Sequence, residues 1–456
     1  MDKTELFENT PVPKAVATLA IPTIISSLVM VLYNLADTYF VGMINDPVQT
    51  AAVTLAAPVM LAFNAVNNLF GVGSSSMMSR ALGAKDHDLV ARSSAFGFYC
   101  SLFSGILFSL LCVLFQNPLL KLLGADALTW DATQSYMLWT VYIGAAPSIL
   151  NVVMAYLVRA EGSSLHASIG TMSGCILNII LDPIFILPWG LNMGAAGAGL
   201  ATCLSNCFAC LYFFGFLFFK RGSTFVCVDP RKFGFRKNVV AGVCTVGIPA
   251  SIQNLLNVTR QTILNNFTAV YGASAVAAMG ITRKVDMVPF QVAMGLSQGI
   301  MPLISYNYAR RNVKRMRETF LYAAKVIVTV LVIAAVVFFV GSETVIRMFM
   351  KNEEIVSYGA QFLRLACIGV PLLSIDFLAV GVFQAVGNGK MALFFAIMRK
   401  IILEIPALYI LNWLFPLYGL AGAATVSEGI LSVIAVIVLV KLFRGWEREF
   451  GEQHIE

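Results

Sequence analysis

Residues 15–41, AVATLAIPTIISSLVMVLYNLADTYFV, decide the class of fold. The run contains one charged residue, Asp37, and it exceeds the ~20 apolar residues that a helix needs to cross a bilayer. Backbone groups in lipid must be hydrogen-bonded within their own segment, so we expect a transmembrane helix here. The run is too long for the apolar part of a signal peptide, and residues 1–14 before it are polar, so no cleavable signal is expected.

Similar apolar runs continue along the 456-residue chain, in which 58% of residues are hydrophobic and 12% are charged. A soluble domain carries about 25% charged residues, so this composition excludes one. The net charge of +7 is spread over the loops, which excludes nucleic-acid binding as the main function. We predict an all-α polytopic membrane protein with twelve spans, at residues 15–41, 51–79, 93–115, 135–158, 168–188, 194–219, 240–269, 274–305, 319–341, 357–384, 391–413 and 416–443.

The basic residues between these runs indicate how the chain is oriented. Most lie at the termini and in the even-numbered loops, whereas the odd-numbered loops hold only Lys121, Arg347 and Lys351. Lys and Arg are enriched in cytoplasmic loops. Both termini are therefore expected in the cytoplasm, in a multi-pass protein of the cell inner (plasma) membrane.

The two halves of the chain resemble each other. Pro22 and Pro249 follow isoleucines 227 residues apart, Ser79 and Ser305 lie 226 apart, and GAAGA (194–198) matches GLAGA (419–423). Six spans in each half make the repeat parallel, about an axis along the membrane normal. We predict an N-lobe over 1–219, a cytoplasmic linker over 220–238 and a C-lobe over 239–456, with a V-shaped central cleft.

Charged residues inside spans are costly and usually functional. Asp37 in span one and Asp182 in span five are expected at similar depth, with Asn178 one helical turn before Asp182. In span six, Ala198 and Thr202 follow a glycine-rich start that permits close helix packing. These oxygens suit Na⁺ or a shared proton. The structural alternative is that Asp37 caps a broken helix and Asp182 only bonds Asn178.

The second half is also polar within its spans. Two pairs, Arg283 with Asp286 and Lys400 with Glu404, have the spacing to neutralise each other. Such pairs join helices, lock a conformation or contact substrate, and the sequence leaves this open. It also leaves open the roles of Arg260, Lys284, Arg399 and Glu428. The candidate cleft residues are Asn254, Asn257, Gln261, Asp286, Asp376 and Glu404.

Five segments of the chain are distinctive: YNLADTYFVG (33–42), LVRAEG (157–162), LNIILDPIFIL (177–187), GAAGAGLAT (194–202) and PLISYNYARRN (302–312). They resemble segments of the MATE (multidrug and toxic compound extrusion) transporters, with the DinF-like, bacterial multidrug branch as the nearest match. Each is short, but their order and placement on the spans are specific. The resemblance covers nearly the whole chain.

The resemblance implies two six-helix lobes and export of lipophilic, mostly cationic compounds in exchange for H⁺ or Na⁺. It assigns cation or proton coupling to five residues of the N-lobe and a conformational hinge to Pro22. The five are Asp37, Asn178, Asp182, Ala198 (through its carbonyl) and Thr202. If sodium is the coupling ion, the side chains of Asp37, Asn178, Asp182 and Thr202 would bind it.

One departure concerns the C-lobe. Many members of one branch carry a glutamate where this chain has Asn257, and Asp376 lies about a turn from the acid of that branch, so a C-lobe cation site is not expected. The alternative function is a lipid or lipid-linked oligosaccharide flippase of the same superfold. Enzyme motifs are lacking, so we expect a transporter without cofactor. Its partners would be small lipophilic cations and membrane lipids, with no nucleic acid, and the chain would act as a monomer.

Overall fold

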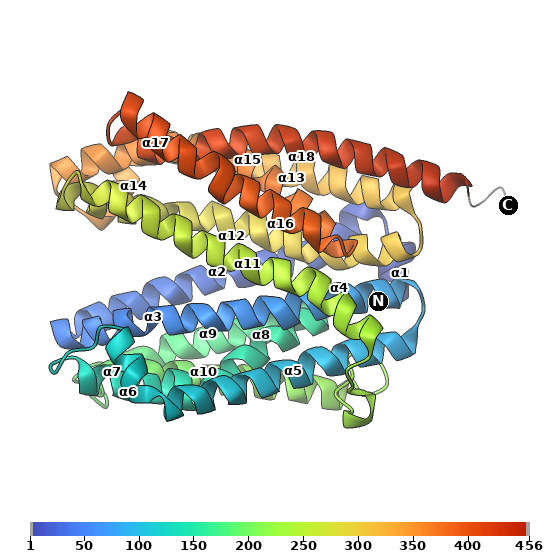
Figure 1. Ribbon diagram of the computed structural model, residues 1–456, viewed down its shortest axis with the longest axis horizontal. Coiled ribbons are helices and arrows are strands. Elements are labelled where there is room, and N and C mark those ends of the chain that lie inside the picture. Colours follow the sequence, from blue (N-terminus) through green and yellow to red (C-terminus); the bar gives the residue numbers. More distant parts are fainter. Residues whose placement is uncertain (1–2, 453–456) are drawn as a thin grey trace. The chain divides into compact units, whose positions relative to one another are not determined.

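The computed structural model describes residues 3–452, and within them the chain forms helices and connecting loops without strands (Figure 1). The elements up to residue 232 are α1 (Lys3–Glu8), α2 (Val12–Met43), α3 (Pro47–Asn67), η1 (Asn68–Val72), α4 (Gly73–Gly83), α5 (His87–Leu114), α6 (Gln116–Leu122), α7 (Trp130–Met137), η2 (Leu138–Ile143), α8 (Ala145–Ala160), α9 (Ser164–Ile186), α10 (Ala195–Phe219) and η3 (Pro230–Lys232). Those that follow are α11 (Lys237–Ala269), α12 (Ala273–Ala309), α13 (Val313–Val340), α14 (Ser342–Phe349), α15 (Glu353–Ala385), α16 (Gly389–Ile397), η4 (Met398–Glu404), α17 (Ile405–Leu414) and α18 (Tyr418–Glu452).

The predicted all-helical membrane fold is confirmed, and the apolar spans are long. Within the described residues, ten helices are long and apolar enough to cross a bilayer, or eleven if the bent pair Trp130–Ile143 and Ala145–Ala160 is one span. That pair is bent by 48°. The predicted span 391–413 corresponds to α16, η4 and α17, where the π-helix η4 interrupts the α-helix and carries charged residues. A π-helical turn inside a helix often marks a functional position.

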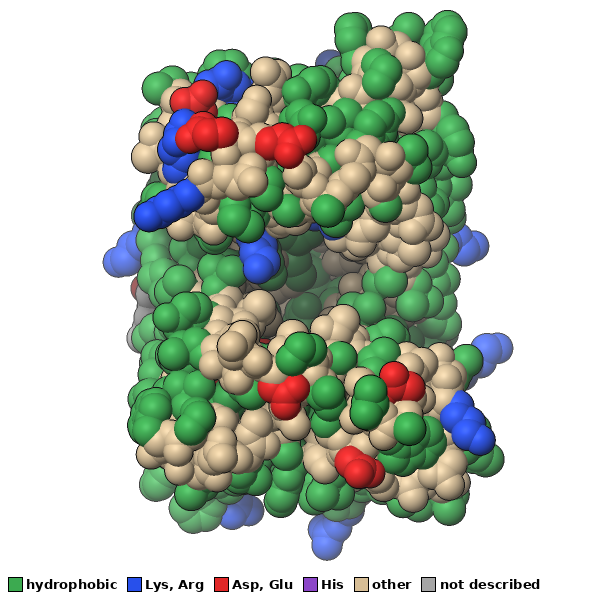
Figure 2. All heavy atoms as spheres, turned by 90° about the vertical axis from the view of Figure 1, so that its left-hand side faces the viewer, with side chains coloured by type: hydrophobic (Ala, Val, Ile, Leu, Met, Phe, Trp, Pro, Cys, Tyr) green, Lys and Arg blue, Asp and Glu red, His purple; other side chains and the backbone are tan. Residues whose placement is uncertain are grey.

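The surface of the helices agrees with a lipid environment. On the face shown in Figure 2, which looks along the long axis of Figure 1, charged side chains are few among hydrophobic and uncharged ones. On α13, exposed apolar side chains such as Ile333, Val337 and Val340 face outward. A soluble protein rarely leaves so much contiguous apolar surface uncovered.

The chain forms two compact units whose boundaries lie inside two long helices. Unit 1 consists of Met1–Ile24 and Ile252–Glu456, and unit 2 consists of Ile25–Ser251. The division therefore falls within α2 and α11, not at the 220–238 segment. The start of α2, from the first repeat, belongs to unit 1 with most of the second repeat. The start of α11, from the second repeat, belongs to unit 2 with most of the first repeat.

Glycines permit this exchange of helix halves. A Cβ on Gly299 of α12 would lie 2.6 Å from the Cα of Ala20 in α2, inside unit 1. In unit 2, a Cβ on Gly73 of α4 would collide with the carbonyl oxygen of Val243 in α11. Because only glycine lacks a Cβ, the backbones can approach this closely at both places. Gly73 and Gly299 occupy equivalent positions in the two repeats.

The beginnings of α5 and α13 show the same correspondence. Asp86 caps α5 by accepting from the backbone N–H of Leu89 at 3.0 Å, and Asn312 caps α13 by accepting from that of Arg315 at 3.1 Å. Both side chains satisfy a backbone donor that the helix itself leaves free. The parallel repeat is thus visible in local hydrogen bonding as well as in sequence.

Candidate functional site

Four of the five predicted coupling residues lie on α9 and α10 of unit 2. Asn178 and Asp182 are one turn apart on α9, and their exposed fractions are 1% and 0%. With its amide nitrogen directed toward the carboxylate, Asn178 donates to Asp182 Oδ2 at 2.8 Å. Its amide oxygen then accepts from the backbone N–H and the hydroxyl of Thr202 at 3.1 and 3.2 Å. Asn178 therefore joins the carboxylate on α9 to α10.

Close packing of α9 against α10 makes this bridge possible. Ala198 lies one turn before Thr202 and is 1% exposed. A Cβ on the neighbouring Gly197 would lie 2.5 Å from the carbonyl oxygen of Phe185 on α9. The glycine-rich start of α10 thus brings its backbone against α9, as expected for small residues in membrane helices.

Asp37 reaches the same region from α2. Its side chain is partly exposed, and it is close enough to Asp182 and Tyr136 for electrostatic interaction. In the described part of the chain, neither Asp37 nor Asp182 forms an ion pair with a basic side chain. Two acidic groups without a cation repel each other unless a proton or metal ion separates them.

Tyr33 and Tyr136 are neighbours of the site that the sequence interpretation missed. Both tyrosine side chains are close enough to Asp37 for electrostatic interaction. Tyr33 lies one turn before Asp37 on α2, so helical spacing placed it on the same face. Tyr33 and Tyr136 therefore add to the polar surroundings of Asp37, while Asn178 joins Asp182 to Thr202.

Unit 1 contains a second polar cluster, which is built around Arg399. Arg399 Nη1 lies 2.6 Å from Asp376 Oδ2, and Arg399 Nε lies 3.9 Å from Glu428 Oε1. The guanidinium also lies over the ring of Phe377, 5.0 Å from its centroid. Ser427 donates to the carbonyl oxygen of Arg399 at 3.0 Å. A cation so enclosed is held by charge, aromatic and hydrogen-bond contacts together.

Glu404 organises the neighbouring part of this cluster. It forms an ion pair with Arg260, and Lys400 Nζ lies 3.2 Å from its Oε2. The predicted neutralisation of Lys400 by Glu404 is thereby confirmed. For Arg283 and Asp286 no ion pair is formed within residues 3–452, and Arg283 Nε and Nη2 are enclosed without a hydrogen-bond partner. Helical spacing permits a pair but does not require one.

The remaining candidates of the second half differ in exposure. Asp376 and Glu404 are each 1% exposed and are paired with cations. Asn254, Asn257 and Gln261 are partly exposed along α11 of unit 1. Lys284 is exposed. Asp376 and Glu404 are therefore enclosed in unit 1, whereas Asp286 and the three amides are partly accessible.

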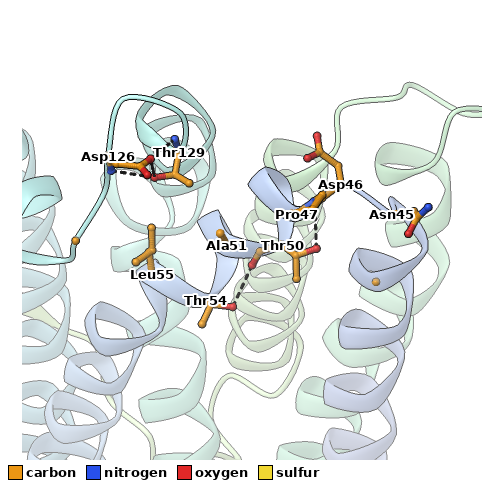
Figure 3. Close-up of a pocket in the computed structure, with 11 residues that line it drawn as sticks. Asn45, Asp46, Pro47, Thr50, Ala51, Thr54, Leu55, Asp126 and Thr129 are labelled. Atoms are coloured by element: carbon orange, nitrogen blue, oxygen red, sulfur yellow. Dashed lines mark hydrogen bonds between the residues drawn. The ribbon is translucent and has the colours of Figure 1, made fainter. Parts of the chain in front are cut away.

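A separate pocket of about 730 Å³ lies at the end of unit 2 where α2 ends and α3 begins. Figure 3 shows Asp46 and Asp126 at its edge, with Thr50 and Thr54 along α3. Asp126 accepts from the backbone N–H and the hydroxyl of Thr129, each at 2.8 Å. These hydrogen bonds hold the pKa of the Asp126 carboxyl below its usual range. The predicted coupling residues do not line this pocket.

Comparison with known proteins identifies the family. The MatE family model matches residues 22–184 and again residues 249–410, one match in each repeat. The chain belongs to the MATE family. The multidrug export protein MepA of Staphylococcus aureus (strain MRSA252) is 31% identical over 436 residues, covering 96% of this MATE chain and 95% of MepA. MepA of Staphylococcus saprophyticus is 30% identical over the same coverage.

Solved MATE structures have the same fold. One is an outward-facing multidrug resistance MATE transporter of the MOP superfamily, with a TM-score of 0.92 and 25% identity, covering 98% of this chain and 99% of that one. Another is a MOP superfamily transporter from Pyrococcus furiosus, with a TM-score of 0.91, 25% identity and the same coverage. This MATE chain is therefore a multi-span membrane protein of a transporter family with the two-lobe fold.

Proposed function

We propose that this MATE protein is a secondary active multidrug antiporter, which exports lipophilic, mostly cationic compounds in exchange for H⁺ or Na⁺. The observation that carries the proposal is the pair of acidic residues Asp37 and Asp182, which lie near each other without a basic partner in the described chain. Such a pair attracts a cation and responds to its arrival. The relatives named multidrug export proteins support the choice of cargo.

The coupling ion would act through the polar contacts of the site. A proton on the carboxylate pair, or Na⁺ held by Asp37, Asn178, Asp182, Thr202 and the Ala198 carbonyl, would alter how α2 meets α9 and α10. The ion must bind one conformation more tightly than the other, since otherwise it drives nothing. In this proposal drug and ion occupy the protein alternately, and α2 bends near Pro22. The protein acts as a monomer in the inner membrane with both termini in the cytoplasm.

The flippase alternative needs free cations for a pyrophosphate group. Five basic residues of the second half could bind such a group. Arg260, Arg399 and Lys400 are each already paired with a carboxylate in unit 1. Arg283 and Lys284 form no ion pair within residues 3–452. Breaking such buried pairs leaves an uncompensated charge, which costs about 3–5 kcal/mol. This pairing favours the antiporter over the flippase.

Ethidium efflux from cells that express the protein tests the proposal. Wild type should lower cellular ethidium, and Asp37→Asn and Asp182→Asn should abolish this effect at equal membrane abundance. A protonophore stops proton-coupled efflux, whereas removal of Na⁺ stops sodium-coupled efflux. Asp131→Asn, at an exposed position of α7, is the control and should export normally. Full efflux by both site variants would contradict the coupling role.

A further inference from the structure

One short segment precedes the first long helix of each repeat, and in each case a charged side chain from elsewhere in the fold binds the backbone of that segment. Other groups add to this, such as Arg310, which pairs with Glu8 at 3.6 Å. We define the first latch as residues 3–10 held by Arg315, and the second latch as residues 223–228 held by Glu161. The first latch lies in unit 1 and the second in unit 2.

The first latch is formed by three backbone carbonyls at the end of α1. Arg315 Nε donates to the carbonyl of Phe7 at 2.7 Å, and its Nη2 donates to those of Thr10 at 2.6 Å and Leu6 at 3.3 Å. An arginine at a helix C-terminus satisfies carbonyls that the helix leaves free. Phe7 is 1% exposed and stacks on Tyr306 at 4.8 Å between ring centroids. Backbone and side chain together fix α1 on α12 and α13.

The second latch uses the opposite charge. Glu161, which is 0% exposed, accepts from the backbone N–H of Phe225 at 2.5 Å and from the hydroxyl of Thr224 at 3.0 Å. The segment continues along α5, where Ser94 accepts from the N–H of Cys227 at 3.0 Å and donates to its carbonyl at 3.1 Å. Hydrogen bonds to an ionised group are stronger than neutral ones. Glu161 therefore holds the segment that enters α11.

The helices that follow the latches share a second property. The division between the units falls two residues after Pro22 in α2 and two residues after Pro249 in α11. Proline has no N–H to donate, so it removes a backbone hydrogen bond from a helix interior. Both helices are therefore weakened next to the point where they leave one unit for the other.

We propose that Arg315 and Glu161 are positioning residues for transport. The latches fix Val12–Ile24 to unit 1 and Lys237–Ser251 to unit 2, so that any bending of α2 and α11 is confined to the proline positions. An ion that bends α2 then moves one half of the helix against a half that is anchored. The inference rests on the proposed antiport, but anchoring itself is measurable without transport.

Hydrogen–deuterium exchange of the purified full-length protein tests the anchoring. In Arg315→Ala, amide protection of residues 3–24 should fall ~10-fold while residues 25–43 exchange as in wild type. In Glu161→Gln, amide protection of residues 223–251 should fall ~10-fold while residues 252–269 exchange as in wild type. Arg315→Lys keeps the charge but loses the planar fork, so it should give an intermediate result and serves if the alanine variant does not fold. The matched controls are the exposed pair Arg317→Ala and Glu447→Gln, which should match wild type.

Ethidium transport and binding by the same variants test the consequence. Both latch variants should lower the maximal efflux rate ~10-fold and change the equilibrium affinity for ethidium less than ~2-fold, since the latches do not contact drug. The inference would be overturned if the latch segments lost amide protection but efflux stayed unchanged. It would also be overturned if the variants showed the same amide exchange as wild type. Equal loss of protection in both halves of α2 would also overturn it. If the wild-type protein moved no ethidium, the proposed antiport would be overturned instead. The hydrogen–deuterium exchange of the variants would still test whether the latches anchor the helices.

Discussion

Ser79 and Ser305 donate equivalent hydrogen bonds in the two repeats. Ser79 Oγ donates to the carbonyl of Ala160 at 2.8 Å, and Ser305 Oγ donates to that of Ala385 at 2.9 Å, across 81 and 80 residues respectively. Both hydroxyls are buried, and each joins the second span of its repeat to the end of the fourth. The repeat is thus preserved in its tertiary contacts.

This equivalence predicts equal energetic effects. Ser79→Ala and Ser305→Ala should each lower the free energy of unfolding by about 1 kcal/mol, because each leaves a buried carbonyl without its donor. Denaturant unfolding in detergent measures both. Thr329→Val, at an exposed hydroxyl that bonds within its own turn, should have no effect. A large loss in one variant with none in the other would show that the two contacts are not equivalent.

The close helix contacts should not tolerate a methyl group. Gly73→Ala and Gly299→Ala should each destabilise the protein by about 1–3 kcal/mol, because the neighbouring atoms are backbone and cannot rotate away. Thermal unfolding of the purified protein tests this. A Cβ on Gly280 of α12 would have no neighbour within 4 Å, so Gly280→Ala is the control. Normal stability of both variants would contradict the close approach.

Tyr33 should contribute to coupling because its hydroxyl is close enough to Asp37 for electrostatic interaction. Tyr33→Phe removes one polar group from the site, worth about 1 kcal/mol, so ethidium efflux should fall ~5-fold rather than vanish. Initial efflux rates at equal abundance provide the measurement. Tyr39→Phe, at a side chain that is 64% exposed, should match wild type. Complete loss of efflux would mean that the Tyr33 hydroxyl is essential to coupling.

The Arg399 cluster predicts a contrast between buried and exposed ion pairs. Arg399→Ala leaves Asp376 buried without its cation, which should cost about 3–5 kcal/mol of stability. Arg347→Ala breaks the exposed pair with Glu353, which solvent screens, and should cost far less. Chemical unfolding compares them. If both variants were equally stable, the Arg399 pair would not be enclosed.

The low pKa of Asp126 makes its contribution depend on pH. The carboxylate is favoured in the folded protein because it accepts hydrogen bonds from Thr129. Its stabilising effect is therefore full above the unfolded pKa of about 3.9 and disappears as pH falls through the folded pKa. Asp126→Asn should be less stable than wild type near neutral pH, and the difference should vanish in acid. A difference that is independent of pH would exclude this origin.

The sequence predicted contacts within one helix better than contacts between helices. Asn178 and Asp182 were paired correctly because helical spacing places them on one face. The pairing of Arg399 with Asp376 joins two helices, and hydrophobic periodicity does not say which helices are neighbours. The spacing of Arg283 and Asp286 permits a pair, but the described residues do not form it.

The boundaries of the units were beyond sequence interpretation for a physical reason. Composition changes at 220–238, where the chain leaves its apolar runs, so a domain boundary was expected there. The contacts change at Ile24 and Ser251 instead, in the middle of uniformly apolar helices. Glycines such as Gly299 mark the packing partners, but a glycine alone does not name its neighbour.

The exchange of first half-helices between units bears on how such a protein could arise by duplication. A half-length ancestor with six spans would lack the start of a long helix in its own unit and could obtain it only from a second copy. Two identical chains would exchange that segment, as in a domain-swapped homodimer. After fusion of the two genes the same exchange takes place within one chain, so the two halves can no longer separate.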